Sequence, residues 1–548
     1  MDVNDRFKTV YDLCIIGAGP AGIITALEYN RLNSHKNVLL LEYGRKEQKI
    51  QNYLDDSIVI QNPINHHLPY DCTNKGLGGT TATWGGRCVT YDKVDFMDRP
   101  IIGDANTWDL DLYNDVNKYL ERSAKYFDCG RPQFNLSYFK KSPAPIAENF
   151  IQGYVTDTSV ERWSLPTRFG KRYAARISRT ENITLLSGWE AHEFQEPDDD
   201  GTVRYLVVRD TSSKEKYQVQ AQKFVIAAGA QETTRVLLRN KRLFKLLKAV
   251  PQALGKYYQG HVSGKIASIK FYGNPKKTDY RFLKDKNGIY IRRRFQFTHE
   301  YLIKENLLNT AFWLDNPRFY DPKHKSGAMS FIYLAMLTPI IGKKLAPTAI
   351  AYSITSGQTN KIGMHLRNVV KGFPLSLTIP ASIFYRRYCL KRKLPGLFTY
   401  SPENTYALHF HAEQIPVENN QMKLDADGET LVINYSLTDE DIASVIKSHE
   451  ALDNWLRKCN CGELEYWFQK TELAKEIRNM SKDGLHQAGT TRIADSPERG
   501  VVNRNLGLWG TTNVFVCSSS VFPTSGQANP TFFMGAFAAR LADHLTHN

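Results

Sequence analysis

The chain has 548 residues, of which 42% are hydrophobic and 23% are charged. This length suffices for two or three domains, or for one large α/β domain with an inserted lobe. The formal net charge of +15 favours an anionic partner, such as a membrane surface or a phosphorylated or carboxylated substrate. Nucleic acid ranks last among such partners, because no zinc-finger spacing or other nucleic-acid-binding motif is present.

Cysteine usage and the N-terminus bear on the cellular compartment. The eight cysteines are scattered, and only Cys459 and Cys461 lie close together. This pattern is neither a disulfide framework nor a metal site, so it favours a reducing compartment. The first residues lack the apolar region of a signal peptide, and no stretch reaches about eighteen uninterrupted apolar residues. We therefore expect a soluble, cytoplasmic protein.

A dinucleotide-binding pattern opens the chain. A short apolar strand over 13–16 leads through GAGPAG into a helix over about 20–32. A second buried strand over 38–41 then ends at Glu42. Strand, glycine-rich turn, helix, strand and acid in this order are typical of a Rossmann-like fold. A glycine-rich turn in some other doubly wound fold is the alternative.

Each part of this pattern has a role in binding a pyrophosphate. Gly17 makes the tight turn, Gly19 lets the backbone approach the phosphates, and Gly22 allows the helix to pack closely on the strand. The helix N-terminus offers unpaired N–H groups, and Glu42 can accept hydrogen bonds from an adenosine ribose. An acid rather than an arginine at position 42 argues against NADP, but the motif alone does not separate NAD from FAD.

The stretch GLGGTTATWGGRCV, residues 76–89, bears on that choice. It is too rich in glycine for a helix or a central strand. We interpret it as a loop whose backbone approaches a flat or phosphorylated group, and we expect Gly79, Thr80, Trp84 and Gly85 to contact the cofactor. A flexible surface loop is the alternative, which the tryptophan amid the glycines disfavours.

A second nucleotide-facing turn is predicted at KFVIAAGAQETTRVLL, residues 223–238. An apolar strand runs into a helix there, with Ala228 and Gly229 at the turn. Three alternating segments before it predict a small antiparallel sheet: 183–194, 202–210 and 216–222. A dinucleotide βαβ unit followed by a β-meander and a strand–AAGA–helix unit is expected of FAD folds, whereas NAD dehydrogenases do not need it.

The C-terminal stretch 483–545 makes the pattern more specific. It contains HQAGTTRI, NVFVCSSSVFPT and NPT in this order, which resembles the C-terminal signature of the glucose–methanol–choline (GMC) oxidoreductases. The resemblance spans most of the chain, since GAGPAG, GGTTATWGG and VIAAGAQETTRVLL also fit it. It looks closest to sugar-oxidising, pyranose-oxidase-like and bacterial members of the family.

The resemblance implies an α/β protein with a discontinuous Rossmann-like FAD-binding domain. A substrate domain of the α+β class, built on a largely antiparallel sheet, is inserted into it. We expect the first part of the FAD-binding domain at 1–260, the substrate-binding domain at 261–479, and the returning part of the FAD-binding domain at 480–548. We expect the substrate sheet around 286–315 and 400–436, and we place the helical segment 106–127 on the substrate side as well.

Alcohol oxidation by a flavin transfers hydride to flavin N5 and needs a base for the hydroxyl proton. A neutral histidine suits this role because it titrates near neutrality. In the GMC family a histidine just before G-T is this base, and His486 matches it. The family also carries His or Asn before its C-terminal helix, and Asn529 matches the Asn form of sugar-oxidising members. A structural core histidine and an ordinary helix cap are the alternatives.

Further cofactor contacts are expected near this pair. Asn529 suits an N-cap and Pro530 the first helical position, so the positive helix end at Thr531 would stabilise negative charge on the reduced flavin. In some sugar oxidases of the family a histidine carries the flavin covalently. Thr83 stands at that position here, so we expect FAD to be bound non-covalently. Ser518 replaces the acid of many members, which leaves open how the ribityl chain is held.

The alternating stretch LHFHAEQ, residues 408–414, predicts a strand that forms the floor of a substrate site. We therefore expect His411 and Gln414 to contact the substrate. Three metal ligands at His409, His411 and Glu413 are an alternative that we do not favour, and no metal is expected.

Two segments, 328–353 and 379–394, mix apolar and basic residues. Such segments can lie on an anionic membrane surface or receive a lipid-linked or phosphorylated substrate. Helices of the substrate domain with a solvated basic face are the other interpretation. We therefore allow a peripheral membrane contact beside a cytoplasmic location.

The sequence thus predicts an FAD-dependent oxidoreductase that acts on an alcohol, on a sugar or glycoside in the first place. A lipid-linked or other hydrophobic alcohol is the alternative substrate. The electron acceptor stays open among dioxygen, a quinone and other carriers. An NAD(P)H-fed flavin enzyme would need a second nicotinamide fingerprint, and none is found. A flavin-binding protein without turnover is the alternative of another class.

Overall fold

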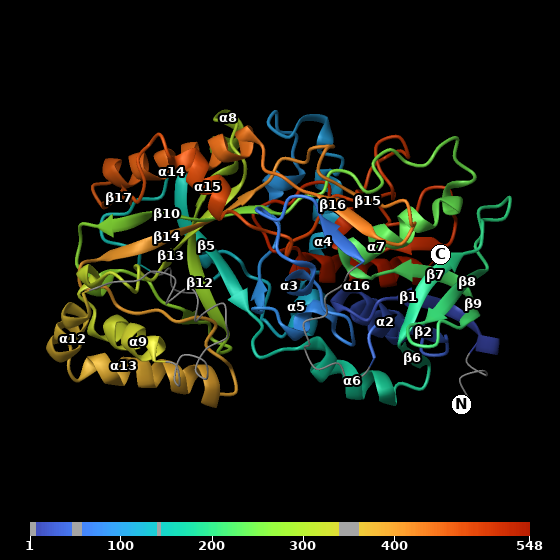
Figure 1. Ribbon diagram of the computed structural model, residues 1–548, viewed down its shortest axis with the longest axis horizontal. Helices are drawn as coiled ribbons and strands as arrows, with labels where there is room; N and C mark the ends of the chain where they lie inside the picture. The colour runs from blue at the N-terminus through green and yellow to red at the C-terminus, as the bar shows by residue number, and fades with distance from the viewer. Residues whose placement is uncertain (1–6, 46–56, 140–143, 339–360, 548) are drawn as a thin grey trace.

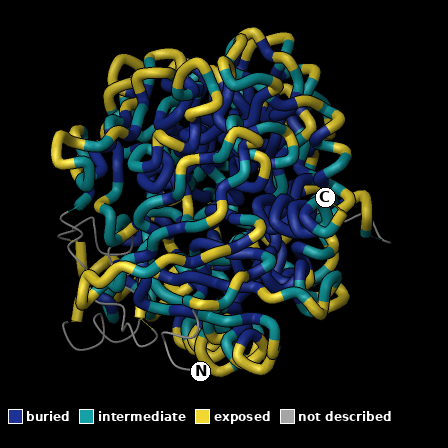
Figure 2. The backbone as a smooth tube through the Cα atoms, turned by 90° about the vertical axis from the view of Figure 1, so that its right-hand side faces the viewer, coloured by how far each residue is buried: buried dark blue, intermediate teal, exposed yellow. Residues whose placement is uncertain are grey.

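The computed structural model describes the following residues: 7–45, 57–139, 144–338 and 361–547. Its elements form two halves that lie side by side along the longest axis, each with its own main sheet (Figure 1). Strands and central helices are mostly buried, and exposed residues gather in the outer turns (Figure 2).

The first half is built on a Rossmann-like sheet. Its strands lie in the order β6, β2, β1, β9, β8 and β7, and β18 pairs with β9. β6, β2, β1, β9 and β18 run parallel, whereas β8 pairs antiparallel with its neighbours on both sides. The strands are β1 (Val10–Ile16), β2 (Val38–Glu42), β6 (Ile183–Ser187), β7 (Trp189–Phe194), β8 (Tyr205–Asp210), β9 (Lys216–Ile226) and β18 (Val514–Val516). β18 returns from the end of the chain, which confirms the predicted discontinuous α/β half.

Segment 183–194 differs from the prediction of one strand of an antiparallel sheet. It divides at Gly188, whose φ of +89° an L residue rarely adopts. β6 before this glycine pairs parallel with β2, and only β7, β8 and β9 form the meander. The apolar pattern alone did not show the break.

Helices of the first half pack around a core that the sheet shares with the C-terminal helix α16 (Pro530–His547). The other helices are α2 (Pro20–Leu32), α3 (Pro69–Cys72), α4 (Leu110–Asn117), α5 (Leu120–Phe127), α6 (Phe169–Arg179) and α7 (Gly229–Arg239). α4 and α5 correct the placement of segment 106–127 on the substrate side. They contact α16, and their apolar side chains join the first core.

The second half is built on an antiparallel sheet in the order β17, β10, β14, β13, β12, β5 and β4, with β11 paired to β12. Its strands are β4 (Arg87–Cys88), β5 (Val155–Trp163), β10 (His261–Phe271), β11 (Leu283–Lys284), β12 (Tyr290–Phe297), β13 (Thr310–Asp315), β14 (Thr405–Glu413) and β17 (Gly462–Tyr466). The predicted antiparallel sheet is confirmed. β4 and β5 belong to it although they precede residue 261.

Three further strands form a separate small sheet and not part of the substrate sheet: β3 (Ile58–Ile60), β15 (Gln421–Leu424) and β16 (Leu431–Asn434). Helix α14 (Asp439–Lys458) covers the second core. Thr438 and Asp441 form a reciprocal capping box at its start, which satisfies two backbone N–H groups that the helix leaves unpaired.

The remaining helices are α8 (His299–Lys304), α9 (Gly327–Leu337), α12 (Ile362–Lys371), α13 (Leu375–Phe384) and α15 (Leu473–Met480). α9 contacts both α12 and α13, and the three form an outer layer beside the second sheet (Figure 1). The part 339–353 of the predicted membrane-facing segment lies outside the described residues. Among the described helices, none is long and apolar enough to cross a membrane.

Candidate active site

A cavity of about 870 Å³ lies in the first half of the chain and reaches Arg87 of β4 in the second sheet. Fourteen of the predicted site residues line it: Gly17, Gly19, Glu42, Gly79, Thr80, Trp84, Gly85, Ala228, Gly229, His486, Ser518, Asn529, Pro530 and Thr531. They come from both ends of the chain, and the parallel pairing of β1 and β18 with β9 brings these ends together. We call the part around Gly17 the nucleotide end and the part around His486 the redox end.

Backbone geometry shapes the nucleotide end. Gly17 has a φ of +103°, and a Cβ there would lie 2.6 Å from the carbonyl oxygen of Ala227. A Cβ on Gly22 would lie 1.9 Å from the carbonyl oxygen of Gly17, so Gly22 packs helix α2 on strand β1 without lining the cavity. At Gly19 a Cβ would meet nothing within 4 Å. No side chain caps α2, which leaves its N-terminal N–H groups for an anion.

Glu42 holds three backbone segments around this end. Its carboxylate accepts the N–H groups of Ala18 at 2.9 Å, Gly44 at 2.8 Å and Gly76 at 2.7 Å. Burial raises the pKa of Glu42, and the three N–H groups oppose that rise. The acid therefore lies where a ribose contact was expected, but it also orders the turns themselves, a role that we did not predict.

The glycine-rich loop is folded back on the first half. Residues Gly79–Ala82 form a short 3₁₀ turn, and Thr81 accepts the backbone N–H of Phe169. The indole N–H of Trp84 donates to the carbonyl of Thr167 at 2.9 Å. Thr83, at the position of the covalent histidine, accepts a hydrogen bond from Asn74 at 2.7 Å. These contacts hold the loop against the cavity.

His486 and Asn529 face each other at the redox end. Nδ2 of Asn529 lies 2.6 Å from Nε2 of His486, and Oδ1 of Asn529 is buried without a hydrogen-bond partner in the structure. Asp483 Oδ2 lies 3.1 Å from Nδ1 of His486. Because a carboxylate accepts at Nδ1, the imidazole proton lies there, and the lone pair of Nε2 accepts from Nδ2 of Asn529 at the edge of the cavity.

Asp483 is a site residue that the sequence analysis missed. Its Oδ1 accepts the N–H groups of Gly484, Leu485 and His486. Its Oδ2 accepts the backbone N–H of His261 at 2.7 Å and lies 3.3 Å from Nδ1 of His261. Burial alone would raise the pKa of Asp483, but the electrostatic interaction with His486 and the hydrogen bonds from both histidines hold it well below its usual range. The acid is therefore ionised near neutrality.

Two further imidazoles stand beside His486. The ring of His261 lies 5.0 Å and that of His411 5.3 Å from the His486 ring, centroid to centroid. His411 Nδ1 donates to the carbonyl of Gln527 at 2.9 Å. Burial lowers the pKa of both His261 and His411, so both are neutral at neutral pH. Ligating nitrogens of the three rings lie within 4.8 Å of one another.

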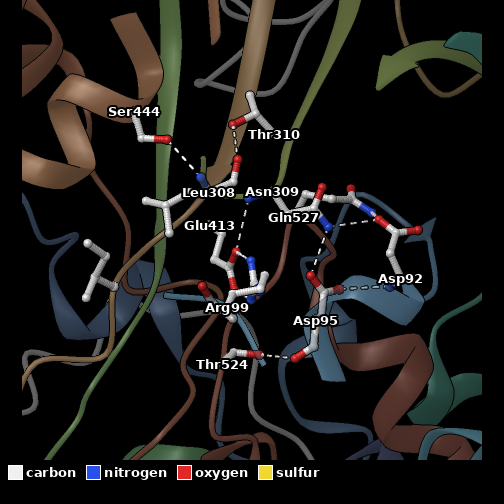
Figure 3. A network of polar contacts seen from close by, with 12 residues as sticks. Asp92, Asp95, Arg99, Leu308, Asn309, Thr310, Glu413, Ser444, Thr524 and Gln527 are labelled. Atoms are coloured by element: carbon white, nitrogen blue, oxygen red, sulfur yellow. Dashed lines mark hydrogen bonds and ion pairs between the residues drawn. The ribbon is translucent and has the colours of Figure 1, made fainter. Parts of the chain in front are cut away.

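A buried ionic network holds the loop that precedes Asn529 (Figure 3). Arg99 binds both oxygens of Glu413, at the end of β14, at 2.6 and 2.7 Å. Asn309 joins Glu413 to Asp92, which also accepts the side-chain amide of Gln527 at 3.0 Å. The loop is thus tied to β14 by a chain of buried side chains, so Asn529 and His411 keep a fixed separation.

Arg87 is a second residue that the sequence analysis missed. It lines the cavity, and its guanidinium contacts Glu161 and lies 4.5 Å from the ring centre of Trp313. Glu161 also binds Arg292. One carboxylate therefore serves two guanidinium groups, and Nη2 of Arg87 has no hydrogen-bond partner. Burial lowers the pKa of Arg87 to about 10.

Other predicted residues do not meet at the site. Gln414 does not line the cavity, because its amide is engaged by the N–H of Gly260 and the carbonyl of Ser436. His409 stacks on Trp313 with the ring centres 4.3 Å apart. Glu413 pairs with an arginine, so the metal alternative of three alternating ligands on this strand does not assemble.

Residues 416–538 match the family model described as GMC oxidoreductase. This part of the chain is therefore similar to the GMC oxidoreductases. A curated relative, the 2-methyl-1,2-propanediol dehydrogenase of Mycolicibacterium austroafricanum, is 26% identical over 149 residues. That match spans 26% of this chain and only 25% of the relative.

Two solved structures share the fold of the whole chain. A fungal aryl-alcohol oxidase covers 98% of this chain and 99% of its own length, at 14% identity and a TM-score of 0.53. A formate oxidase variant from Aspergillus oryzae RIB40 covers 98% of both chains, at 12% identity and a TM-score of 0.51. The predicted architecture of a Rossmann-like half joined to an antiparallel half is therefore shared with these two oxidases. The expected closeness to pyranose oxidases is not among these findings.

GMC oxidoreductases bind FAD, and the cavity fits this cofactor. Positions for a Cβ on Gly19, Gly85 and Gly229 are open, so the backbone can approach a ligand at each. The uncapped start of α2 fits a pyrophosphate. Oδ1 of Asn529 is buried without a hydrogen-bond partner, so the redox end can accept a ligand that donates a hydrogen bond.

Proposed function

We propose that this protein is an FAD-dependent oxidoreductase that oxidises an alcohol, with His486 as the base. One observation carries the proposal. Nε2 of His486 is held between Asn529 and the cavity while Asp483 occupies Nδ1, and the same cavity begins at a dinucleotide-binding turn. FAD, when bound, supplies the acceptor for the hydride that leaves the alcohol carbon.

The side chains of the redox end handle the proton. A bound alcohol would replace the amide of Asn529 at Nε2 of His486. Its hydroxyl would donate to Nε2, and its oxygen would accept from Nδ2 of Asn529. As His486 takes the proton it becomes a cation, and the ionised Asp483 stabilises that cation through Nδ1. Asp483 is thus a positioning residue: it selects the tautomer and lowers the cost of protonation without touching the substrate.

The start of α16 supports the same chemistry. The helix begins at Pro530, directly after Asn529, and Pro530 and Thr531 line the cavity. Its positive N-terminal end would favour negative charge on a neighbouring group. Thr83 offers no nucleophilic nitrogen at the position where relatives attach FAD, so we propose non-covalent binding.

For the substrate we propose a sugar or glycoside, as the likeness of Asn529 to sugar-oxidising members suggested. Three polar atoms around the redox end lack hydrogen-bond partners: Nη2 of Arg87, Nε2 of His261 and Oδ1 of Asn529. A ligand with several hydroxyls could satisfy donors and acceptors of this kind together. His411 stands next to them and is retained as a candidate substrate contact.

A lipid-linked alcohol is the second candidate substrate. It is favoured by the exposed apolar and basic side chains of α12 and α13, which lie on the half that carries the substrate sheet. The electron acceptor stays open among dioxygen, a quinone and other carriers.

The test is anaerobic mixing of the FAD-loaded protein with a substrate panel. The panel contains free sugars, glycosides, nucleotide sugars, polyprenol-linked sugars and simple aliphatic alcohols. We expect one class to bleach the flavin absorbance with saturation, which would identify the substrate class. If the flavin stays oxidised with every alcohol although FAD is bound, the protein is a flavin-binding protein without turnover.

A further inference from the structure

The outer helices expose an unusual concentration of large apolar side chains. Of the 21 exposed large hydrophobic side chains in the described part of the chain, ten lie between Ile362 and Tyr388. Nine fall on α12, on α13 and on the turn Tyr385–Cys389 that follows α13, and Phe373 lies between the two helices. The exposed fraction of the residue is 75% at Val370, 69% at Phe373 and 61% at Leu375.

The spacing of these residues shows that they form one continuous apolar face on the surface. Ile362, Leu366 and Val370 follow one another at intervals of four residues, which places them on one stripe of α12, and Phe373 lies just beyond the end of this helix. His365, on the side of α12 that faces the protein, is buried and hydrogen-bonded to Ser330 of α9. The apolar stripe therefore faces away from the protein, the reverse of an ordinary surface helix.

Charge on this layer is of one sign. Between Pro322 and Pro402 the sequence has twelve Lys and Arg residues and no Asp or Glu. Arg367, Lys371 and Lys391 form no ion pair with any residue that the structure describes. Basic side chains beside exposed apolar ones complement a surface that is anionic outside and apolar beneath.

The layer is attached firmly to the second half. Ile383 of α13 packs with Trp163, Phe282 and Tyr290 in a small core beside the second sheet. Arg392 binds Asp128 and the carbonyl of Leu165. A surface bound to this layer would therefore be held against the half that carries the substrate sheet.

We propose that α12, α13 and the turn Tyr385–Cys389 form a docking surface for an anionic phospholipid bilayer, which this protein binds peripherally. The apolar stripe enters the headgroup region, and the basic side chains contact lipid phosphates. A second copy of the chain fits less well. A twofold interface would set this face against itself, and Arg367 and Lys371 of the two copies would then meet side chains of the same sign.

The test is co-sedimentation of the full-length holoprotein with lipid vesicles. We expect binding to vesicles of equal parts phosphatidylcholine and phosphatidylglycerol, weakened by salt, and little binding to phosphatidylcholine alone. The double variant V370E/F373E should bind the anionic vesicles more than tenfold more weakly. The matched control I64E/I151E, which changes two isoleucines of similar exposure elsewhere, should bind like the wild type.

A charge variant tests the electrostatic part independently. Substituting alanine for Arg367, Lys371 and Lys391 should weaken binding to the anionic vesicles about fivefold for each basic side chain. Retained FAD absorbance would show that this variant is folded. Equal binding by V370E/F373E and the wild type would overturn the proposal. So would a dimer in light scattering that V370E/F373E converts to a monomer, since the occupant would then be a second copy.

Discussion

The two ends of the cavity are built in different ways. The nucleotide end is made of backbone: turns at Gly17, Gly19 and Gly229, tied together by the carboxylate of Glu42. The redox end is made of side chains, with His486 and Asn529 brought together from segments 43 residues apart. The first end can bind a nucleotide through groups that every residue has, whereas the chemistry of the second depends on single side chains. Substitutions at the two ends should therefore fail differently.

The largest effect is expected from His486→Ala. Loss of the base should slow anaerobic flavin reduction by about 10²–10⁴-fold, while FAD stays bound because the nucleotide end is untouched. Stopped-flow absorbance with a saturating substrate measures the rate. A rate equal to that of the wild type would remove His486 from the chemistry.

Asp483→Asn should have the next largest effect. An amide at this place can donate to Nδ1 and so favour the wrong tautomer, and it cannot stabilise the protonated ring. We expect the reduction rate to fall by about 10²-fold, the lower end of what a general base contributes, because the base itself remains, together with a shifted pH profile. Asp439→Asn, an exposed acid paired with Arg478, is the control and should change neither. An unchanged pH profile in the Asp483 variant would show that the residue is only structural.

Glu42→Gln probes the nucleotide end. The neutral amide accepts the N–H groups of Ala18, Gly44 and Gly76 more weakly, so the turns around the cofactor loosen. We expect the dissociation constant for FAD to rise about tenfold, as for the loss of one hydrogen bond to a charged group. The rate of reduction at saturating FAD should stay close to that of the wild type. A reduction rate that falls as far as in the His486 variant would contradict the separation of the two ends.

The smallest effect concerns acid stability of the core behind the redox end. His449 on α14 is buried between the rings of Phe312 and Phe410 and donates to the carbonyl of Val445. Burial lowers the pKa of His449 from 6.5 to about 4. Between pH 6.5 and pH 4 the imidazole of His449 is therefore protonated in the unfolded chain but not in the folded chain. The free energy of unfolding consequently falls as the pH drops through this range.

His449→Gln should remove this contribution. The wild type should lose about 3 kcal/mol more than the variant between pH 7 and pH 4. Denaturant unfolding followed at both pH values measures the difference in the free energy of unfolding. Equal losses in the two proteins would mean that His449 does not titrate on unfolding.

Local patterns in the sequence predicted the nucleotide end well. The predicted helix 20–32 is found at Pro20–Leu32, and the predicted start of the C-terminal helix at Pro530 is found as well. Turns, caps and apolar periods are properties of neighbouring residues, so a single sequence shows them. The capping box of Thr438 and Asp441 was visible for the same reason.

Contacts between distant segments could not be predicted in this way. Asp483 lies next to His486 in the sequence, but its bond to His261 exists only because the chain returns to β10. Arg87 meets Glu161 across the β4–β5 pair, and Gln414 turned inwards to the backbone of Gly260. Side-chain direction at such places follows from packing in three dimensions, which periodicity does not encode.

The visible absorption spectrum of the purified protein tests the central claim most directly. The account predicts the two absorbance bands of an oxidised flavin, and it predicts that acid precipitation releases FAD into the supernatant, because the cofactor is not covalently attached. No flavin absorbance, even after incubation with added FAD, would contradict the assignment of this cavity to FAD. The same result would contradict the role proposed for His486 as the base.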